Sequence, residues 1–467
     1  MNKGLKVLTI SLLMIVWNFS VLVSQNVAKL ESKLDSVIQS NMESNHIPGA
    51  AFIIVKDGKV LLKKGYGYTS LGEEIRRVRP DSTIFRIGSI TKTFTATALM
   101  QLVDQGKIDL HTDVNTYLTS LKVQDTFSKP ITPWHLLTHS AGFDEISGRR
   151  VFRASEQIPL KIFLKDRLIR LREPGVISSY SSYAIALAGL LVEDVSGMSL
   201  AEYMKKHIWD PLEMNMTNMG LSDEQERYTS WGYEYRRGIN VPQPWEFYHT
   251  YPSSDINSTV SDMGKYLLMH LNLGKHNNKT ILSSKMTSEM HKQQLSAHTE
   301  VEGFGLGFYE EYANGFRTVS HGGDMLGYSG YMALIPEKNL GVYIVSHHEG
   351  SRFRYMVLSA ILEYFQENKA TLEPNPKRVM QDLSKFEGSY LWSTHCHTCE
   401  NGWKPTAEQL VVNDDNTFSI FGRKFFQIGP LLFKSFDGRR TMGFVENKKG
   451  EIIYMSTGSS NVFEKID

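Results

Sequence analysis

The sequence has only two cysteines, no internal repeat, no low-complexity segment and no excess of either charge. Its 51 Lys and Arg residues nearly balance its 50 Asp and Glu residues, which gives a formal net charge of +1. Nucleic-acid-binding proteins usually carry a clear basic excess, so we expect no nucleic-acid partner. The remaining composition, 41% hydrophobic and 22% charged residues, is typical of a soluble globular protein. A length of 467 residues allows two or three domains.

Long hydrophobic runs are also missing, except at the N-terminus. There Lys3 and Lys6 precede the apolar run Val7–Trp17, and the small residue Ser24 follows. This pattern is typical of a secretory signal peptide covering residues 1–24, and the run is short for a membrane-spanning helix. We therefore expect an exported protein, periplasmic or secreted, that is not stably inserted in a membrane after cleavage. An uncleaved N-terminal membrane anchor is the alternative.

The two cysteines, Cys396 and Cys399, lie close together in the chain. In an exported protein such a pair is expected to form a local disulfide that closes a tight loop, or to remain as free thiols. The neighbours His395 and His397 offer a zinc site as the alternative, because thiolate and imidazole both suit that ion. Four ligands within five residues, however, give poor geometry for one tetrahedral ion. We therefore expect no metal and no cofactor.

Strand patterns lie at both ends of the first 366 residues, and helical patterns fill the middle. The pair Asp57-Gly58 between two apolar runs is the strongest short-range signal for a β-hairpin. A helix-rich stretch covers about Ser89–Leu273. Further strand patterns occur at Phe316–Val319, Tyr328–Pro336 and Gly341–Ser346, and helical patterns at Asn26–Met42 and Tyr355–Phe365. This arrangement predicts an α+β domain over residues 29–366, with one antiparallel sheet built from both ends, flanked by helices and carrying a large helical insert.

A second, smaller domain is predicted at the C-terminus. Two prolines in Glu373–Lys377 preclude regular structure and indicate a linker, which we place at residues 367–382. From about Leu383 onward, short alternating runs are separated by turn residues: Gly388–Trp392, Gln409–Val412, Phe418–Phe421, Leu431–Phe433, Met442–Val445 and Ile452–Met455. Such runs predict a small antiparallel all-β domain over residues 383–467.

Ser89 and Lys92 are the first candidate catalytic pair. They open a segment with helical spacing, Thr93–Val103, which places Ser89 at a helix N-terminus where unpaired backbone N–H groups favour developing negative charge. Lys92, three residues on, lies on the same helix face and could take the serine proton if its pKa is lowered. About one or two Ser-x-x-Lys strings are expected by chance in a chain of this composition. The alternative is that Ser89 merely caps the helix.

Two further segments carry polar groups with similar potential. Tyr180 and Ser182 stand just before or at the start of an apolar helix, Ala184–Val195. His321, Gly322, Gly323 and Asp324 begin a strand-like segment, and paired glycines allow a ligand to approach the backbone closely.

These three segments occur in the order of the signature motifs of the class C β-lactamase and penicillin-binding-protein-like serine hydrolases. Ser89-x-x-Lys92, Tyr180-Ser-Ser182 and His321-Gly-Gly323 resemble those motifs, and connecting segments such as Ile131–Phe143 resemble the family as well. The resemblance covers about Lys29–Phe365, and implies a β-lactamase/transpeptidase-like fold. The segment after Leu383 resembles the small β domain often appended to family members.

The resemblance implies an acyl-enzyme mechanism without a cofactor. Ser89 attacks a carbonyl carbon while Lys92 and Tyr180 share the general-base role, and the backbone N–H groups of Ser89 and Asp324 form the oxyanion hole. Ser182, His321, Gly322 and Gly323 are implied to contact the substrate. Tyr180 then protonates the leaving group and helps to activate water for deacylation.

Two departures from the family pattern bear on the substrate. Dedicated β-lactamases have Lys where this chain has His321, and Asn where it has Ser182. His321 is largely neutral at pH 7 unless its pKa is raised, so it lacks the permanent charge that would bind a substrate carboxylate. Both departures favour an esterase, or a peptidase or carboxypeptidase acting on D-amino-acid peptides, at least as well as an antibiotic-hydrolysing enzyme. The substrate is then a small molecule, short peptide or ester, and the oligomeric state stays open.

Two alternatives to the hydrolase remain at this point. The chain could be a non-catalytic sensor that binds cell-wall peptides, although such a protein has no need of the Ser89–Lys92 pair. A metallohydrolase built on Cys396 and Cys399 would lose activity to chelators. His135 and His139 fall four residues apart on an expected helix, but the Glu of a His-Glu-x-x-His metal motif is absent, so we interpret them as packing residues.

Overall fold

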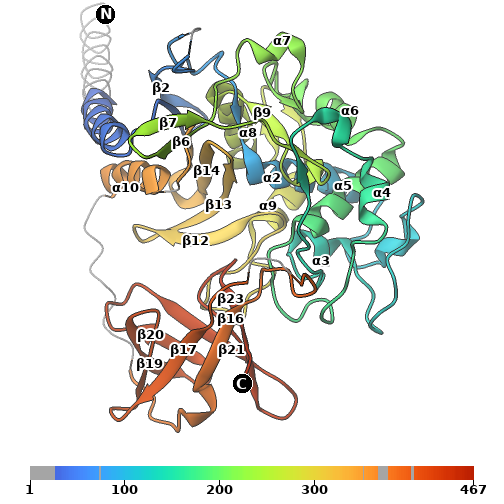
Figure 1. Ribbon diagram of the computed structural model, residues 1–467, viewed down its shortest axis with the longest axis vertical. Coiled ribbons are helices and arrows are strands. Elements are labelled where there is room, and N and C mark those ends of the chain that lie inside the picture. The colour runs from blue at the N-terminus through green and yellow to red at the C-terminus, as the bar shows by residue number, and fades with distance from the viewer. Residues whose placement is uncertain (1–26, 73–74, 351, 367–376, 401–403) are drawn as a thin grey trace, which may run out of the picture.

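The computed structural model describes residues 27–72, 75–350, 352–366, 377–400 and 404–467. The expected signal peptide, residues 1–24, lies outside the described residues, and so does most of the expected linker, residues 367–376. Figure 1 shows a large body of helices and strands with a small β-barrel below it. Within the described part of the chain no single helix is both long and apolar enough to cross a membrane; only the pair Ser182–Ser196 and Leu200–Trp209, bent by 77°, reaches that length and composition.

The large body is organised around one six-stranded antiparallel sheet. Its strands in spatial order are β12 (Tyr309–Ala313), β13 (Phe316–Met325), β14 (Tyr328–Ile335), β15 (Leu340–Ser346), β1 (Gly49–Lys56) and β2 (Lys59–Gly67). β1 and β2 form the predicted hairpin, in which Asp57 and Gly58 have φ values of 50° and 78°, as a two-residue turn of type I′ requires. β1 also pairs with β15, from Ala50 opposite Ser346 to Lys56 opposite Leu340. The prediction of a single sheet built from both ends is therefore confirmed.

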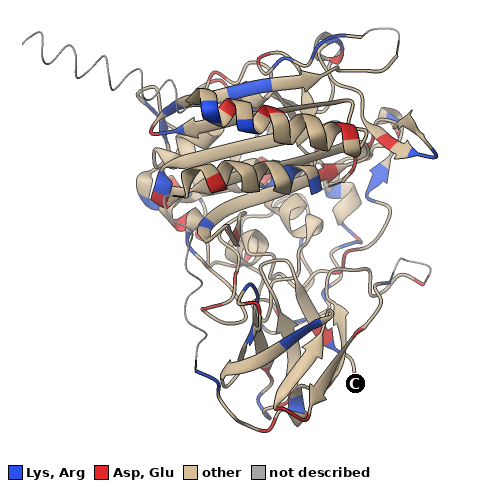
Figure 2. Ribbon diagram, turned by 90° about the vertical axis from the view of Figure 1, so that its left-hand side faces the viewer, with Lys and Arg blue, Asp and Glu red and all other residues tan. Residues whose placement is uncertain are grey.

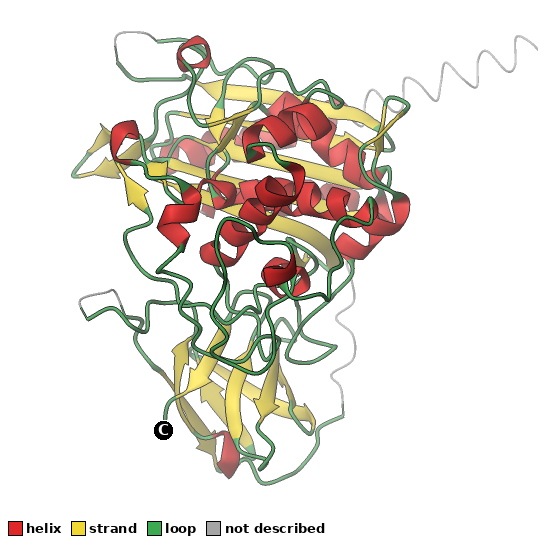
Figure 3. Ribbon diagram, turned by 90° about the vertical axis from the view of Figure 1, so that its right-hand side faces the viewer, coloured by secondary structure: helices red, strands yellow, loops and turns green. Residues whose placement is uncertain are grey.

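Helices cover both faces of this sheet because its strands are buried on both sides. Along β1, Ala50, Phe52 and Ile54 pack into one hydrophobic cluster, and the alternate residues pack into the other. The first cluster is covered by helix 27–44 and α10 (Arg352–Phe365), which lie side by side across the sheet in Figure 2. The opposite face, seen in Figure 3, is covered by α2 (Thr91–Asp104), α5 (Ser182–Ser196) and α8 (Val260–Leu271).

The middle of the chain is the predicted helical insert, interrupted by small sheets. Its shorter helices are η1 (Gly88–Ile90), η2 (Val114–Thr116), α3 (Pro133–Leu137), η3 (Ala154–Glu156), α4 (Leu160–Leu164), α6 (Leu200–Met204), η4 (Lys205–Trp209), α7 (Asp223–Glu226), η5 (Tyr251–Ser253) and α9 (Ser284–His291), and η6 (Pro336–Lys338) lies between β14 and β15. The small sheets pair β3 (Phe85–Arg86) and β5 (Asn218–Met219) with β9 (Ile256–Ser258), β4 (Arg150–Val151) with β8 (Phe247–Tyr248), β6 (Tyr233–Arg236) with β7 (Ile239–Pro242), and β10 (Lys275–His276) with β11 (Lys279–Thr280).

The C-terminal domain is a closed barrel that begins after η7 (Ser384–Phe386). Its strands are β16 (Gly388–Trp392), β17 (Glu408–Asn413), β18 (Thr417–Ile420), β19 (Arg423–Gly429), β20 (Leu432–Ser435), β21 (Thr441–Glu446), β22 (Ile452–Ser456) and β23 (Val462–Lys465). β23 pairs with β16 and closes the barrel around buried aromatic residues that include Phe386, Phe418 and Phe433. The predicted all-β domain is confirmed, but the sequence did not predict β19 and β23. β19 buries three consecutive residues and carries a bulge, so it shows no alternation, and β23 has charged residues at two of its four positions.

Candidate active site

Ser89 lies in the tight turn η1, which leads directly into α2. The residues at the N-terminal caps of η1 and α2 are Ile87 and Ile90, and neither makes a side-chain capping bond. Ser89 is therefore not the helix cap that the sequence offered as the alternative. Gly88 before it has a φ of 54°, and a Cβ atom there would lie 3.1 Å from the backbone nitrogen of Asp324. The turn that carries Ser89 thus packs closely against the strand that carries Asp324.

Lys92 is the second residue of α2, and its side chain points back at Ser89. Its Nζ atom is 3.1 Å from the Oγ atom of Ser89 and donates to the carbonyl oxygen of Ser253 at 2.9 Å. The Lys92 side chain has no exposed surface. Burial, helped by the nearby charge of Arg149 and opposed by that of Glu145, lowers the pKa of Lys92 to about 7. A large fraction of Lys92 is therefore a neutral amine at neutral pH and can accept a proton.

Tyr180 completes this group from the loop before α5. Its ring centre is 4.9 Å from the Nζ atom of Lys92, and its hydroxyl is hydrogen-bonded to Ser89 and Tyr309. Burial raises the pKa of Tyr180 to about 12, although those two hydrogen bonds act in the opposite direction. The Tyr180 hydroxyl is therefore protonated at neutral pH and is placed to donate a hydrogen bond. Ser182, two residues on, is the buried first residue of α5.

His139 holds the Tyr180 segment in place. Its backbone carbonyl accepts the N–H of Ser179 at 2.8 Å, and its Nδ1 atom accepts the N–H of Ser181 at 2.9 Å. The ring centres of His139 and Tyr180 are 4.6 Å apart. Burial holds the pKa of His139 well below its usual value, so the ring is neutral and Nδ1 is free to accept. The expectation that His135 and His139 share a helix was wrong, because α3 ends at Leu137 and His139 has a left-handed φ of 54°.

His321 lies within β13 and faces the same group. It has no exposed surface, and its ring stacks on Tyr309 with centres 4.4 Å apart. Its Nδ1 atom is 2.6 Å from the carbonyl oxygen of Gly322, whereas its Nε2 atom has no hydrogen-bond partner among the described residues. Burial and the neighbouring charge of Lys92 lower the pKa of His321 to about 3, so the ring is neutral. The sequence predicted that the segment beginning at Ser320 starts a strand. In the structure this segment is the second half of β13, which begins at Phe316.

Gly323 and Asp324 bring β13 against the turn of Ser89. A Cβ atom on Gly323 would lie 1.9 Å from the carbonyl oxygen of Ile87, so only glycine allows this approach. The side chain of Asp324 points to the other face of the sheet, where it forms an ion pair with Arg354 at 2.7 Å. Its backbone nitrogen lies next to Gly88 of the turn, while its carboxylate is turned toward Arg354.

Four residues at the site were not singled out as functional from the sequence. Tyr309 and Ser253 supply a hydroxyl and a carbonyl oxygen to Tyr180 and Lys92, and Glu145 and Arg149 form an ion pair at 3.4 Å whose charges act on Lys92. No local pattern marks these residues, since Tyr309, Ser253 and the Glu145–Arg149 pair reach the site from three different parts of the chain. The only available signal was that Glu145 closely follows Ile131–Phe143, a segment that resembles the family.

The loop between β7 and β8 contacts the strand that carries part of the site through one buried acid, Glu246. Glu246 has no exposed surface, and it accepts the backbone N–H of Leu326 at 3.0 Å, directly after β13. Arg150 binds the other carboxylate oxygen at 2.7 Å. Glu246 thereby fixes the end of the strand that carries His321 and Asp324.

The two cysteines form a disulfide, with sulfur atoms 2.00 Å apart. Both sulfurs are therefore bonded and offer no thiolate to a zinc ion. Among the described residues, no group of three or more His, Cys, Asp or Glu side chains is arranged to hold a metal ion.

The sheet, the helical insert and the Ser89 turn together define the fold of the serine β-lactamases and penicillin-binding-protein homologues. A family profile described as beta-lactamase matches residues 34–364, and the chain belongs to this family. Protein flp of Staphylococcus aureus (strain MW2) is 26% identical over 330 residues, which cover 68% of this chain and 63% of protein flp. The match thus spans less than two thirds of the length of that relative.

Solved structures show the same architecture. The octameric penicillin-binding protein homologue from Pyrococcus abyssi is 26% identical, with a TM-score of 0.64 and coverage of 93% of this chain and 99% of that one. The β-lactamase/D-alanine carboxypeptidase from Pseudomonas syringae is 21% identical, with a TM-score of 0.60 and coverage of 72% and 99%. The predicted family and the β-lactamase/transpeptidase-like fold are both confirmed.

Proposed function

We propose that this protein is a serine hydrolase that cleaves amide or ester bonds through an acyl-enzyme. The observation that carries the proposal is the contact between Lys92 and Ser89, in which a buried lysine with a pKa of about 7 lies 3.1 Å from a serine hydroxyl. A serine hydroxyl is a weak nucleophile until a neighbouring base takes its proton, and a desolvated lysine is such a base. A non-catalytic sensor would have no need of this pair.

In the proposed reaction the Oγ atom of Ser89 attacks the carbonyl carbon, and its proton passes to the neutral amine of Lys92. The backbone N–H groups of Ser89 and Asp324 stabilise the oxyanion, and donors of this kind commonly contribute about 3 to 4 kcal/mol each. The bond to the leaving group then breaks, and the Tyr180 hydroxyl delivers a proton to that group and is reprotonated from Lys92. Water attacks the acyl-enzyme by the same proton route and restores Ser89.

The substrate we propose is a small ester, or the amide bond of a short D-amino-acid peptide. His321 supports this proposal because it is buried and its pKa is lowered to about 3, so it offers no positive charge to a carboxylate beside the scissile bond. A charge-assisted hydrogen bond contributes about 1.5 to 3 kcal/mol, so its absence removes an advantage of about tenfold or more that a substrate with that carboxylate would otherwise have. A screen of p-nitrophenyl esters, D-Ala-D-Ala peptides and nitrocefin measures this preference.

Covalent labelling tests the nucleophile. We expect a fluorophosphonate probe to label the purified protein, and Ser89→Ala to abolish labelling and turnover while keeping the thermal unfolding midpoint. Ser284→Ala is the matched control, because Ser284 is an exposed serine that also opens a helix followed by lysine. Labelling that survives Ser89→Ala contradicts the proposal. Saturable binding of a cell-wall peptide with no turnover of any ester or amide favours the sensor instead.

We also propose that the protein is exported, on the strength of the sequence of residues 1–24 alone. N-terminal sequencing of the protein recovered from the culture medium or periplasm tests this. A mature N-terminus near residue 25 is expected, and an intact Met1 on a membrane-associated protein indicates an anchor.

A further inference from the structure

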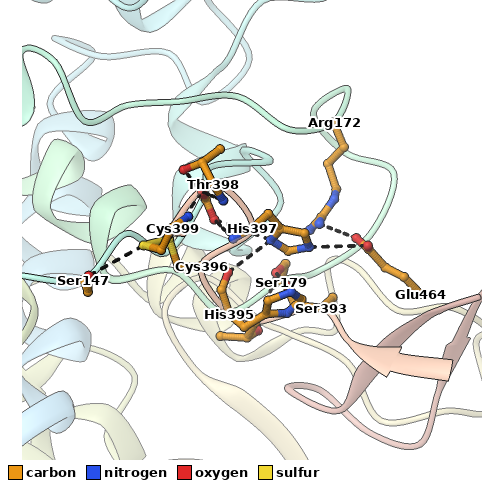
Figure 4. Close-up of polar contacts among 12 residues, drawn as sticks. Ser147, Arg172, Ser179, Ser393, His395, Cys396, His397, Thr398, Cys399 and Glu464 are labelled. Atoms are coloured by element: carbon orange, nitrogen blue, oxygen red, sulfur yellow. Dashed lines mark hydrogen bonds and ion pairs between the residues drawn. A yellow bond between two sulfur atoms is a disulfide. The ribbon is translucent and has the colours of Figure 1, made fainter. Parts of the chain in front are cut away.

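A loop of the barrel, Ser393–Cys399, lies directly against the part of the hydrolase domain that carries the proposed active site (Figure 4). Ser179, the residue before Tyr180, donates its hydroxyl proton to the carbonyl oxygen of Ser393 at 3.2 Å. The Ser179 hydroxyl is buried by this contact. Ser179 therefore links the Tyr180 segment both to the barrel, through its hydroxyl, and to His139, through its backbone N–H.

The same loop surrounds a second buried group, the carboxylate of Asp144. Asp144 has no exposed surface and accepts the backbone N–H groups of His397 and Thr398 at 2.8 and 3.0 Å, together with the Thr398 hydroxyl at 2.6 Å. The His397 ring lies 3.4 Å from the same carboxylate. Asp144 immediately precedes Glu145, whose charge acts on Lys92. The barrel loop thus also fixes the segment that places Glu145 beside the catalytic lysine.

The charges at this contact alternate in sign. His397 is within 3.4 Å of Glu464 as well as Asp144, and Glu464 forms an ion pair with Arg172, whose side chain is only 8% exposed. Burial disfavours the charged ring, but the nearby carboxylates of Asp144 and Glu464 outweigh it and raise the pKa of His397 to about 9. His397 is therefore a cation at neutral pH between two carboxylates, one from each domain.

The disulfide gives the loop its shape. It joins Cys396 to Cys399 across the two residues whose N–H groups bind Asp144, and the N–H of Cys399 lies 3.1 Å from the Cys396 sulfur. Ser147, in the segment that follows Asp144, contacts the Cys399 sulfur at 3.6 Å. Closing a short loop in this way reduces the number of conformations open to it, so the donors for Asp144 are preorganised.

We propose that the disulfide-closed loop Ser393–Cys399 is a positioning element of the active site. Ser393 fixes Tyr180 through Ser179, and His397 and Thr398 fix Glu145 through Asp144. The barrel is then part of the catalytic unit and not an accessory module. This inference rests on the proposed acyl-enzyme function, and His397 acts in it as a positioning residue that does not touch the substrate.

Turnover of a p-nitrophenyl ester by the full-length protein tests the proposal. We expect His397→Gln and Ser179→Ala each to lower kcat by about tenfold or more, with KM changed by less than about threefold, because a displacement of about 1 Å at a catalytic group can cost about a hundredfold in rate. His397→Arg, which keeps a cation between the two carboxylates, should recover most of the loss. Lys385→Gln is the control, because it removes a barrel ion pair, with Glu446, that lies outside the loop; it should leave kcat unchanged.

Reduction of the disulfide in the folded wild-type protein is a second test, and it does not depend on whether a variant folds. The chain has only these two cysteines, so a phosphine reductant acts on this disulfide alone. We expect kcat and the rate of fluorophosphonate labelling to fall on reduction and to return on reoxidation. The double variant Cys396→Ser/Cys399→Ser should have a low kcat and a low labelling rate, and the reductant should change neither.

The proposal is overturned if the loop variants and the reduced protein keep the wild-type kcat, or if Lys385→Gln lowers kcat as much as they do. It is also overturned if the loss of kcat merely follows the loss of folded protein, as measured by the thermal unfolding midpoint. Failure of the proposed function looks different, since the wild-type protein itself would then show no labelling at Ser89.

Discussion

The Nζ atom of Lys92 lies 3.1 Å from the Oγ atom of Ser89 and is shielded from solvent on all sides. Lys92 accepts a proton only when it is neutral, and burial places its pKa near 7. We therefore expect kcat/KM for ester hydrolysis to rise with pH through a midpoint of about 7 and to level off above it. Lys92→Arg, which keeps the charge at every accessible pH, should lose at least about a hundredfold in kcat. A profile that is flat or falls between pH 6 and 8 contradicts the role of Lys92 as base.

His139 and His135 form a matched pair for a test of how Tyr180 is held. His139→Ala leaves the N–H of Ser181 without its acceptor, and His135→Ala does the same to the N–H of Thr132. Each loss of a buried partner costs about 1 to 3 kcal/mol of stability. We expect similar decreases in unfolding free energy by urea denaturation, but a fall in kcat of about tenfold or more for His139→Ala only. Equal effects on kcat would show that His139 contributes stability alone.

Gly323 and Gly322 are adjacent, yet a methyl group should be tolerated very differently at the two positions. At Gly323 the new Cβ atom meets the carbonyl oxygen of Ile87 at 1.9 Å, whereas at Gly322 it meets the Nη2 atom of Arg354, the end of a long side chain, at 3.2 Å. We expect Gly323→Ala to lower the thermal unfolding midpoint by several degrees, as a loss of about 1 to 3 kcal/mol implies, and Gly322→Ala to lower it much less. The opposite order would show that β13 does not pack against the Ser89 turn in this way.

The His397 contact should make stability depend on pH in a known direction. The pKa of His397 is raised in the folded protein, to about 9 from an ordinary value of 6.5. Its stabilising contribution is therefore complete below about pH 6.5 and is lost as pH rises through about 9. We expect the difference in unfolding midpoint between wild type and His397→Gln to be largest near pH 6 and to shrink steadily up to pH 10. A difference that grows with pH contradicts the assignment.

Local patterns were sufficient for most of the fold and for the centre of the site. The Asp57-Gly58 pair between two apolar runs made the hairpin visible, and the spacing of Ser89 and Lys92 survives in the structure because both stand on one rigid turn and helix. The roles of His139 and Tyr309 could not be predicted, because they depend on loops and strands that meet only in the folded protein. His139 needs a left-handed backbone to reach both neighbours of Tyr180, and nothing in its sequence context indicates that conformation.

The contact between the two domains was hidden for a similar reason. The Cys396–Cys399 pair and the prolines of the linker could be identified in the sequence. No contact with the hydrolase domain could be predicted, either for the cysteine loop or for the rest of the barrel. Asp144 is an ordinary acidic residue until the N–H groups of His397 and Thr398 meet it from the other domain. Such pairings join segments far apart in the chain, and one sequence alone carries no signal for them.

The pairing of β1 with β15 has a consequence for how the chain reaches its native state. Ala50 bonds across the sheet to Ser346, so the second strand of this pair is synthesised only after the whole helical insert. A sheet that depends on such distant partners closes slowly, because the entropy of a very long loop is lost before the contacts form. Until β15 has been synthesised, the backbone N–H and C=O groups along one edge of β1 therefore lack their hydrogen-bond partners. The hairpin is therefore exposed to aggregation until Ser346, nearly three quarters of the way along the 467 residues, has been synthesised.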